Sequence, residues 1–162
     1  MVANGNAKLV SATPVIDTNI YASGDQLGGL MVFENTVDEQ SGTGTIMSVS
    51  ILDGDSQNAA IDILFFDAIP TITSSDNAAL DISDSEMASK FLGAVSFAAS
   101  DYKSLAANSY ATSRTVGLFL RSTTRSVTNL TGTNVYAVLQ SRGTPTFSGA
   151  GKLTVKLGIL QD

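Results

Sequence analysis

Short apolar segments separated by clusters of Gly, Ser, Thr, Asn and Asp run through the whole sequence, and this pattern restricts the fold more than any other feature. Apolar runs of strand length that end at turn-forming residues are typical of antiparallel β structure. Helical periodicity, by contrast, is scarce. The pattern predicts strands at residues 8–12, 15–22, 30–35, 44–52, 61–66, 93–98, 114–121, 134–141 and 152–159.

The distribution of apolar residues within a strand predicts how that strand is buried. In residues 152–159 every second residue from Leu153 to Ile159 is apolar, which indicates a strand that is buried on one face. Residues 61–66 are apolar on both faces except at Asp62. We therefore expect this second strand at the centre of a sandwich or beneath a neighbouring subunit.

The predicted strand at residues 44–52 alternates between apolar residues and serine in its second half. Because successive side chains of a strand point to opposite faces, we expect Met47, Val49 and Ile51 to be buried together. The serines between them should face solvent.

One short helix is predicted at residues 84–92. Ser83 followed by Glu86 three residues later matches the capping box that begins many helices, and apolar residues come directly after it. We expect this helix to cover one end or edge of the sheets and to stop at Gly93.

The number and spacing of these segments predict the fold class. Eight or nine short strands with one brief helix favour an all-β fold, namely a two-sheet antiparallel sandwich of jelly-roll type, with a small closed barrel as the alternative. The 162-residue chain contains neither a long polar linker nor a repeat of solenoid length. We therefore expect a single domain over residues 1–162, with residues 1–13 as an N-terminal arm.

The absence of two residue types excludes most familiar catalytic sites. Without cysteine the chain cannot form disulfides, thiolate nucleophiles or thiolate metal sites, and without histidine it lacks the commonest general base and transition-metal ligand. The net charge of −6 argues against binding to nucleic acid, and no apolar run approaches the length of a membrane span. The sequence predicts no enzyme, no cofactor, no metal site, no nucleic-acid partner and no membrane segment.

Two groups of carboxylates could bind a metal ion or act in catalysis, but a structural role is the simpler interpretation of each. Asp53 and Asp55 could begin a calcium loop, yet Leu64 occupies the twelfth position, where such a loop needs Glu, so we expect a β-turn. Other carboxylates could pair as in a glycosidase, but their spacing does not require it, and we expect them on strand faces and at turns. These are Asp17, Asp25, Glu34, Asp62 and Asp67.

Residues 24–29, with the sequence GDQLGG, are rich in glycine, as phosphate-binding loops are. Such a loop joins a strand to a helix and is followed by Lys, whereas an apolar strand follows here. The segment therefore predicts a turn or a bulge.

Arginine is concentrated in the second half of a chain that has only nine basic residues. Arg114, Arg121, Arg125 and Arg142 are candidates for a protein interface, because a flat guanidinium pairs with carboxylates while the stem of its side chain packs against a neighbour. Lys8 is a fifth candidate. The alternative is that these residues are ordinary charges of edge strands and loops.

Five segments, spread over nearly the whole chain, carry a resemblance to known sequences. They are TPVIDTNIYASGDQLGGLM (13–31), NAAIDILFFD (58–67), SDNAALDISDSEMASKFLGAVSF (75–97), RGTPTF (142–147) and LTVKLGILQD (153–162). These segments resemble a recurring family of proteins encoded among the structural genes of tailed phages. The resemblance implies a virion component, and capsid cement or decoration proteins are commonly small β sandwiches that assemble as trimers.

The function expected from this resemblance is that of a capsid cement or decoration protein, which binds the assembled shell and stabilises it through non-covalent contacts. Its expected partners are the major capsid protein and further copies of this chain, with a homotrimer favoured. A low-charge β domain without cysteine or histidine suits such a passive clamp. A tail or fibre subunit and a carbohydrate-binding module are the alternatives, and a carboxylate-based hydrolase has the least support.

Two segments are sequence candidates for contacts with a neighbour, namely the arm at residues 1–13 and the loop at residues 121–134. A polar start rich in Asn and Gly is more useful when it lies over a neighbour than when it is free. Deletion of residues 1–7 should then weaken assembly and leave the fold intact.

Overall fold

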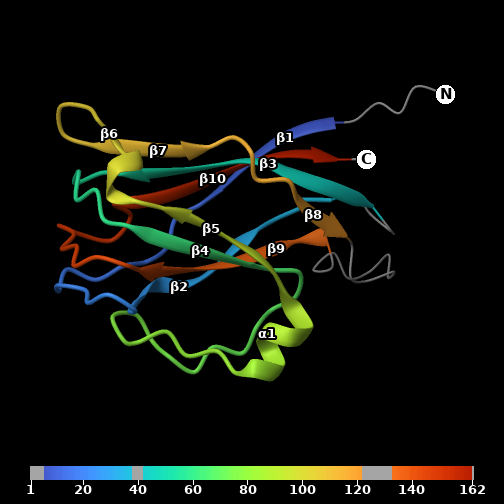
Figure 1. The fold of residues 1–162 in the computed structure, drawn as a ribbon, viewed down its shortest axis with the longest axis horizontal. Coiled ribbons are helices and arrows are strands. Elements are labelled where there is room, and N and C mark those ends of the chain that lie inside the picture. Colours follow the sequence, from blue (N-terminus) through green and yellow to red (C-terminus); the bar gives the residue numbers. More distant parts are fainter. Residues whose placement is uncertain (1–5, 38–41, 122–132, 162) are drawn as a thin grey trace.

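The computed structural model describes residues 6–37, 42–121 and 133–161, which fold into two antiparallel sheets (Figure 1). The first sheet has the order β1-β10-β3-β7-β6, and β8 also pairs with β3. Its strands are β1 (Asn6–Ala12), β3 (Thr43–Asp53), β6 (Lys103–Ser104), β7 (Ser109–Ser113), β8 (Leu118–Arg121) and β10 (Leu153–Gln161). The second sheet has the order β2-β9-β4-β5, with β2 (Gln26–Phe33), β4 (Ile61–Phe66), β5 (Phe91–Phe97) and β9 (Val135–Ser141).

Strand pairing joins segments that lie far apart in the chain. β1 pairs with β10, β2 with β9, β3 with β7 and β8, and β4 with β5, all antiparallel. Such nested pairs arise when one long antiparallel ribbon folds over on itself. The predicted all-β sandwich of two antiparallel sheets with one short helix is confirmed, and its jelly-roll type stays a prediction that the nested order supports.

Seven of the nine predicted strands form, with boundaries shifted by a few residues, as β1 to β5, β9 and β10. Residues 15–22 instead form an irregular loop, in which Asp17 accepts a hydrogen bond from the backbone N–H of Asn19 and turns the chain. Residues 114–121 form a strand only in β8, because Gly117, at a φ of 61°, turns the backbone before it. The polar strands β6 and β7 were not predicted.

The N-terminal segment is part of the sandwich from Asn6 onward. Residues 6–12 form β1 and pair with β10 along its whole length, from Asn6 opposite Gln161 to Ala12 opposite Val155. This part of the predicted arm is therefore an edge strand of the sheet. Residues 1–5 lie outside the described residues.

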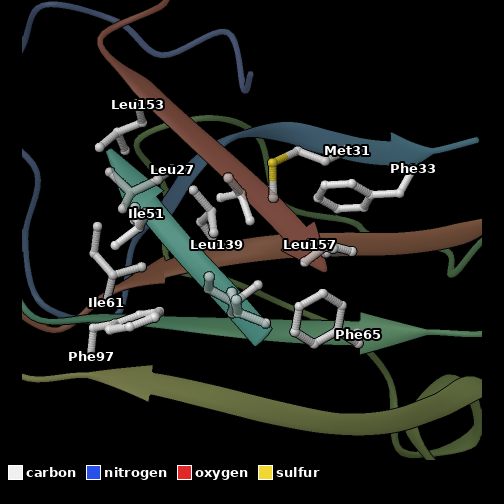
Figure 2. Packing of buried hydrophobic residues seen from close by; sticks show 14 of the residues in the cluster. Leu27, Met31, Phe33, Ile51, Ile61, Phe65, Phe97, Leu139, Leu153 and Leu157 are labelled. Atoms are coloured by element: carbon white, nitrogen blue, oxygen red, sulfur yellow. The ribbon is translucent and has the colours of Figure 1, made fainter. Parts of the chain in front are cut away.

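The main hydrophobic core lies between the two sheets. Figure 2 shows Ile51 and Leu157 of the six-stranded sheet meeting Phe65 and Leu139 of the four-stranded sheet. Each of these side chains is fully buried. The predicted alternation in β10 is confirmed, because its residues are buried at every second position from Leu153 onward.

A second, smaller core covers the outer face of the four-stranded sheet. Phe66, Tyr136 and Val138 point away from the main core and pack against side chains of residues 67–90. These side chains include Ile72, Leu80, Ile82 and Met87. The apolar segment at residues 61–66 is thus covered on its outer face by the protein's own chain, which agrees with the central position that we predicted for β4.

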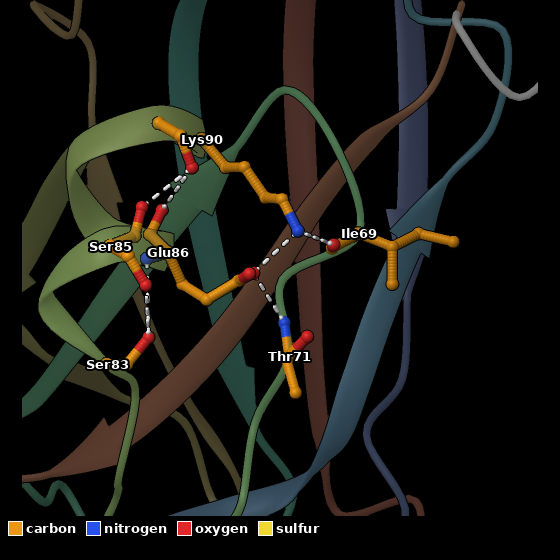
Figure 3. A network of polar contacts seen from close by, with 7 residues as sticks. Ile69, Thr71, Ser83, Ser85, Glu86 and Lys90 are labelled. Carbon is orange, nitrogen blue, oxygen red and sulfur yellow. Dashed lines mark hydrogen bonds and ion pairs between the residues drawn. The ribbon is translucent and has the colours of Figure 1, made fainter.

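The predicted helix forms as α1 (Asp84–Lys90), and polar contacts tie it to the chain that precedes it (Figure 3). The Ser83 hydroxyl accepts a hydrogen bond from the backbone N–H of Glu86. The Glu86 carboxylate accepts from the Thr71 backbone N–H at 2.7 Å and pairs with Lys90 at 2.6 Å. The Lys90 ion pair, followed by the Thr71 hydrogen bond, lowers the pKa of Glu86. The helix ends before Gly93 because β5 begins directly after Lys90.

The structure corrects the burial predicted for Met47. Gly158 lies opposite Ser48, but its neighbour Ile159 lies opposite Ile46, so Met47 is an extra residue that forms a bulge in β3. The bulge reverses the alternation, so Ile46 faces the core and the Met47 side chain is 48% exposed. Val49 and Ile51 are buried as predicted.

A polar turn follows β3, as predicted. The Asp53 carboxylate accepts hydrogen bonds from the backbone N–H groups of Asp55 and Asn58, at 3.0 and 2.8 Å. The Asp55 carboxylate accepts from the Ser148 backbone N–H at 2.7 Å and pairs with Lys152 at 3.1 Å. The two carboxylates thus fasten the turn to the loop that precedes β10.

We expect Asp55→Asn to lower the free energy of unfolding at pH 7 by about 1 kcal/mol, because the neutral amide loses the ion pair with Lys152 and has one oxygen where the carboxylate accepts with two. The Ser148 backbone N–H, followed by Lys152, lowers the pKa of Asp55 against the opposing effect of desolvation. The stabilisation is therefore fully present above the ordinary pKa of 3.8 and is lost as the pH falls through the lower folded value.

Urea denaturation of both proteins from pH 7 to pH 2 would measure this dependence. Glu34→Gln is the control, because Glu34 is exposed and makes no hydrogen bond or ion pair within the described residues. If the free energies of unfolding of wild type and Asp55→Asn differed by the same amount at every pH, the stabilisation would not depend on ionisation of Asp55.

Candidate interaction surface

Three of the scattered carboxylates are held by contacts within the chain. Asp62 pairs with Arg142 at 2.6 Å, and Asp67 lies 3.7 Å from Arg121. Asp25 accepts a hydrogen bond from a backbone N–H in its own loop. Within residues 6–37, 42–121 and 133–161, no three His, Cys, Asp or Glu side chains are grouped so that they could hold a metal ion.

The structure separates the basic residues that we predicted as one interface. Lys8 donates a hydrogen bond to the backbone carbonyl of Asn35 at 2.6 Å, while Arg121 and Arg142 are in the ion pairs described above. Arg114 is exposed and has no partner among the described residues. Arg125 and most of the loop at residues 121–134 lie outside the described residues. An interface role stays a prediction, and it has the best structural support for Arg114.

The tyrosines offer little surface for stacking against a sugar ring. Tyr21, Tyr102 and Tyr136 are buried, and Tyr110 is 42% exposed. The Tyr21 hydroxyl is used internally, since it donates a hydrogen bond to Asp76 at 2.8 Å. The tyrosines of the described residues therefore give little support to a carbohydrate-binding module.

The outer face of the six-stranded sheet, which we call the open face, carries several large exposed apolar side chains. Leu9 is 71% exposed, Met47 48%, Phe119 79% and Leu160 40%. They lie on four strands that are adjacent through β10 and β3, because Leu160 is opposite Thr45 and Thr45 is opposite Phe119. The four-stranded sheet has its own chain over its outer face, whereas these side chains remain in solvent.

A groove divides the apolar half of the open face. It has a volume of about 420 Å³ and lies between Leu9 and Met47, with Gly158 between them. A Cβ at position 158 would overlap the Ser48 hydroxyl, so glycine keeps this part of the sheet free of side chains. The groove could receive an apolar side chain of a partner.

The other half of the open face carries a polar row, beyond which Leu52 and Tyr110 are exposed at 41% and 42%. Ser11, Lys156, Ser50 and Thr112 lie in one row across four strands. The Ser50 and Thr112 hydroxyls are 2.9 Å apart and satisfy each other, and Lys156 has no ion-pair partner among the described residues. The face thus joins apolar knobs to small hydroxyl groups, a mixture that is suited to contact with protein.

No protein-family model matches this chain. No curated protein matches its sequence either. Within the described residues, no helix is long and apolar enough to cross a membrane.

Sequence reasoning missed the open face, although a signal for it exists. Consecutive apolar residues occur at Ile46–Met47 and at residues 118–120, where strict alternation would place a polar residue. In a strand that is covered on one face only, such pairs leave one apolar side chain in solvent. Which member of each pair is exposed depends on the bulge at Met47 and on the pairing of β8.

Proposed function

We propose that this chain is a phage capsid cement protein that binds the assembled shell through its open face. The observation that carries the proposal is the asymmetry of the sandwich. Residues 67–90 cover one outer face, whereas the other outer face exposes Leu9, Met47, Phe119 and Leu160. Exposed apolar patches on a well-packed domain usually mark contacts with other proteins.

The physical properties of the chain support binding to a repeated surface. Only 15% of its residues are charged, and four of the five carboxylates considered as catalytic groups, Asp17, Asp25, Asp62 and Asp67, are used in ion pairs and turns. A modest apolar patch gives weak binding in one copy, but many copies on a shell multiply the buried area. The sequence resemblance to phage structural proteins supports the same role.

Two aspartate substitutions on the open face test the proposal. We expect Phe119→Asp and Leu9→Asp each to weaken binding to the shell about tenfold or more, because the carboxylate would lose its hydration in the contact. Co-sedimentation with capsids of the phage that encodes the chain measures this binding. Circular dichroism would verify that both variants remain folded.

Leu105→Asp is the matched control, since Leu105 is 59% exposed but lies in the loop that connects β6 with β7. It should bind shells like wild type. If wild type binds isolated tails or fibres and ignores shells, the chain is a tail or fibre subunit. Equal shell binding by wild type and both open-face variants would contradict the role of this face.

A further inference from the structure

A second groove lies where the edges of the two sheets separate. It has a volume of about 560 Å³ and is lined by β5 on one side and by β6 and β7 on the other. A hollow of about 260 Å³ shares Ser96, Ser113 and Thr115 with this groove and extends it to Gly93 and Leu118. We call the two together the edge groove.

The strand edges beside the edge groove are open. β5 is the last strand of its sheet and pairs only with β4 among the described strands. β6 covers the edge of β7 only at Ser109 and Tyr110, so no described strand pairs with the edge of β7 beyond them. Open strand edges present unpaired backbone groups that a second chain can use.

The edge groove also contains basic residues that have no hydrogen-bond or ion-pair partner among the described residues. Four of the described basic residues form ion pairs within the chain, and Lys8 is hydrogen-bonded to a backbone carbonyl. Lys103, Arg114 and Lys156 remain, and two of these three, Lys103 and Arg114, line the edge groove. The groove also contains one carboxylate, Asp101, which accepts a hydrogen bond from the backbone N–H of Ala98 at 2.8 Å, so two positive charges face one negative charge. The groove is therefore suited to carboxylates.

The same chain carries the complementary charge on a different surface. Residues 67–90 contain five carboxylates and one Lys. Asp84 at the start of α1 is exposed and makes no hydrogen bond or ion pair among the described residues, and the exposed Asp81 carboxylate contacts only the Thr73 hydroxyl. One copy thus presents free carboxylates, and another copy presents free cations.

We propose that the edge groove of one copy binds the acidic segment at residues 67–90 of a second copy. The contact joins two different surfaces, so it is heterologous, and its repetition forms a ring when the rotation between neighbours closes after a whole number of copies. A trimer is such a ring. Charge complementarity selects this partner, and the open strand edges and hydroxyl groups of the groove add hydrogen bonds. Thr112 lines both the edge groove and the open face, but the apolar side chains Leu9, Met47, Phe119 and Leu160 do not line the groove and stay available for the shell.

A charge exchange within one chain tests the contact. We expect wild type to be oligomeric by light scattering, and Arg114→Glu and Asp84→Lys each to raise the dissociation constant about tenfold or more. The double variant carries Glu in the groove and Lys in the acidic segment of every copy. It should therefore assemble again, whatever the number of subunits in the ring.

Lys156→Glu is the control, since it changes the net charge as much as Arg114→Glu but lies on the open face. It should assemble like wild type. A monomeric wild type at high concentration, a double variant that stays dissociated, or equal dissociation of Lys156→Glu would overturn the proposal. Shell binding by Phe119→Asp is measured separately, so failure of the edge-groove contact is distinguishable from failure of the proposed function.

Discussion

Phe65→Ala is expected to lower the free energy of unfolding by about 4 kcal/mol, the largest effect of any substitution considered. Phe65 lies in the central strand β4, is fully buried, and points into the main core between the sheets (Figure 2). Removing its ring loses the transfer free energy of the buried atoms and leaves a cavity that paired strands on both sides cannot close. Urea or guanidinium denaturation at equilibrium measures the loss.

Phe119→Ala is the matched control for this substitution. It removes the same ring from a side chain that is 79% exposed on the open face, so the expected loss is below about 0.5 kcal/mol. The comparison separates the effect of burial from the effect of removing a phenylalanine ring. A loss at Phe119 as large as that at Phe65 would show that the open face is packed against protein in the molecule studied.

Gly28→Ala is expected to lower the free energy of unfolding by about 2–4 kcal/mol, for two independent reasons. Gly28 has a φ of 74°, a left-handed conformation that alanine adopts only with strain. A Cβ there would lie 2.7 Å from the Cβ of Pro14 and 3.0 Å from the carbonyl oxygen of Val15. The loop after β1 would have to move away from β2.

Gly29→Ala provides the control at the adjacent residue. A Cβ at Gly29 meets no atom within 4 Å, and its backbone is outside the left-handed region. Its expected effect is within about 0.5 kcal/mol of zero. Thermal unfolding of the two variants would show the contrast, and equal melting temperatures would contradict the packing described for Gly28.

Gly28 also illustrates how far the sequence could predict local structure. The glycines of residues 24–29 predicted a turn or a bulge, and the register of β2 against β9 is irregular between Leu27 and Met31. The sequence could not show which glycine is indispensable. That depends on Pro14, which approaches Gly28 only in the folded chain.

The candidate site could be predicted less well than the fold. The basic residues were chosen because arginine favours interfaces, but ion pairs with Asp62 and Asp67 occupy two of them. Such pairs cannot be read from the sequence, because their members are far apart along the chain. Arg142 and Asp62 come together only because β9 and β4 are neighbouring strands. The apolar residues of the open face were not predicted, because alternation alone does not say which face of a strand is covered.

The sequence by itself determined the all-β class, most strand positions, the capped helix and the absence of cysteine and histidine chemistry. These properties depend on local periodicity, turn residues and composition, which act over a few neighbouring residues. The tertiary structure decided which outer face residues 67–90 cover, which side chains the bulge at Met47 exposes, and which cations remain unpaired. Those outcomes follow from pairing between distant strands, whose register is set by the free energy of the whole core.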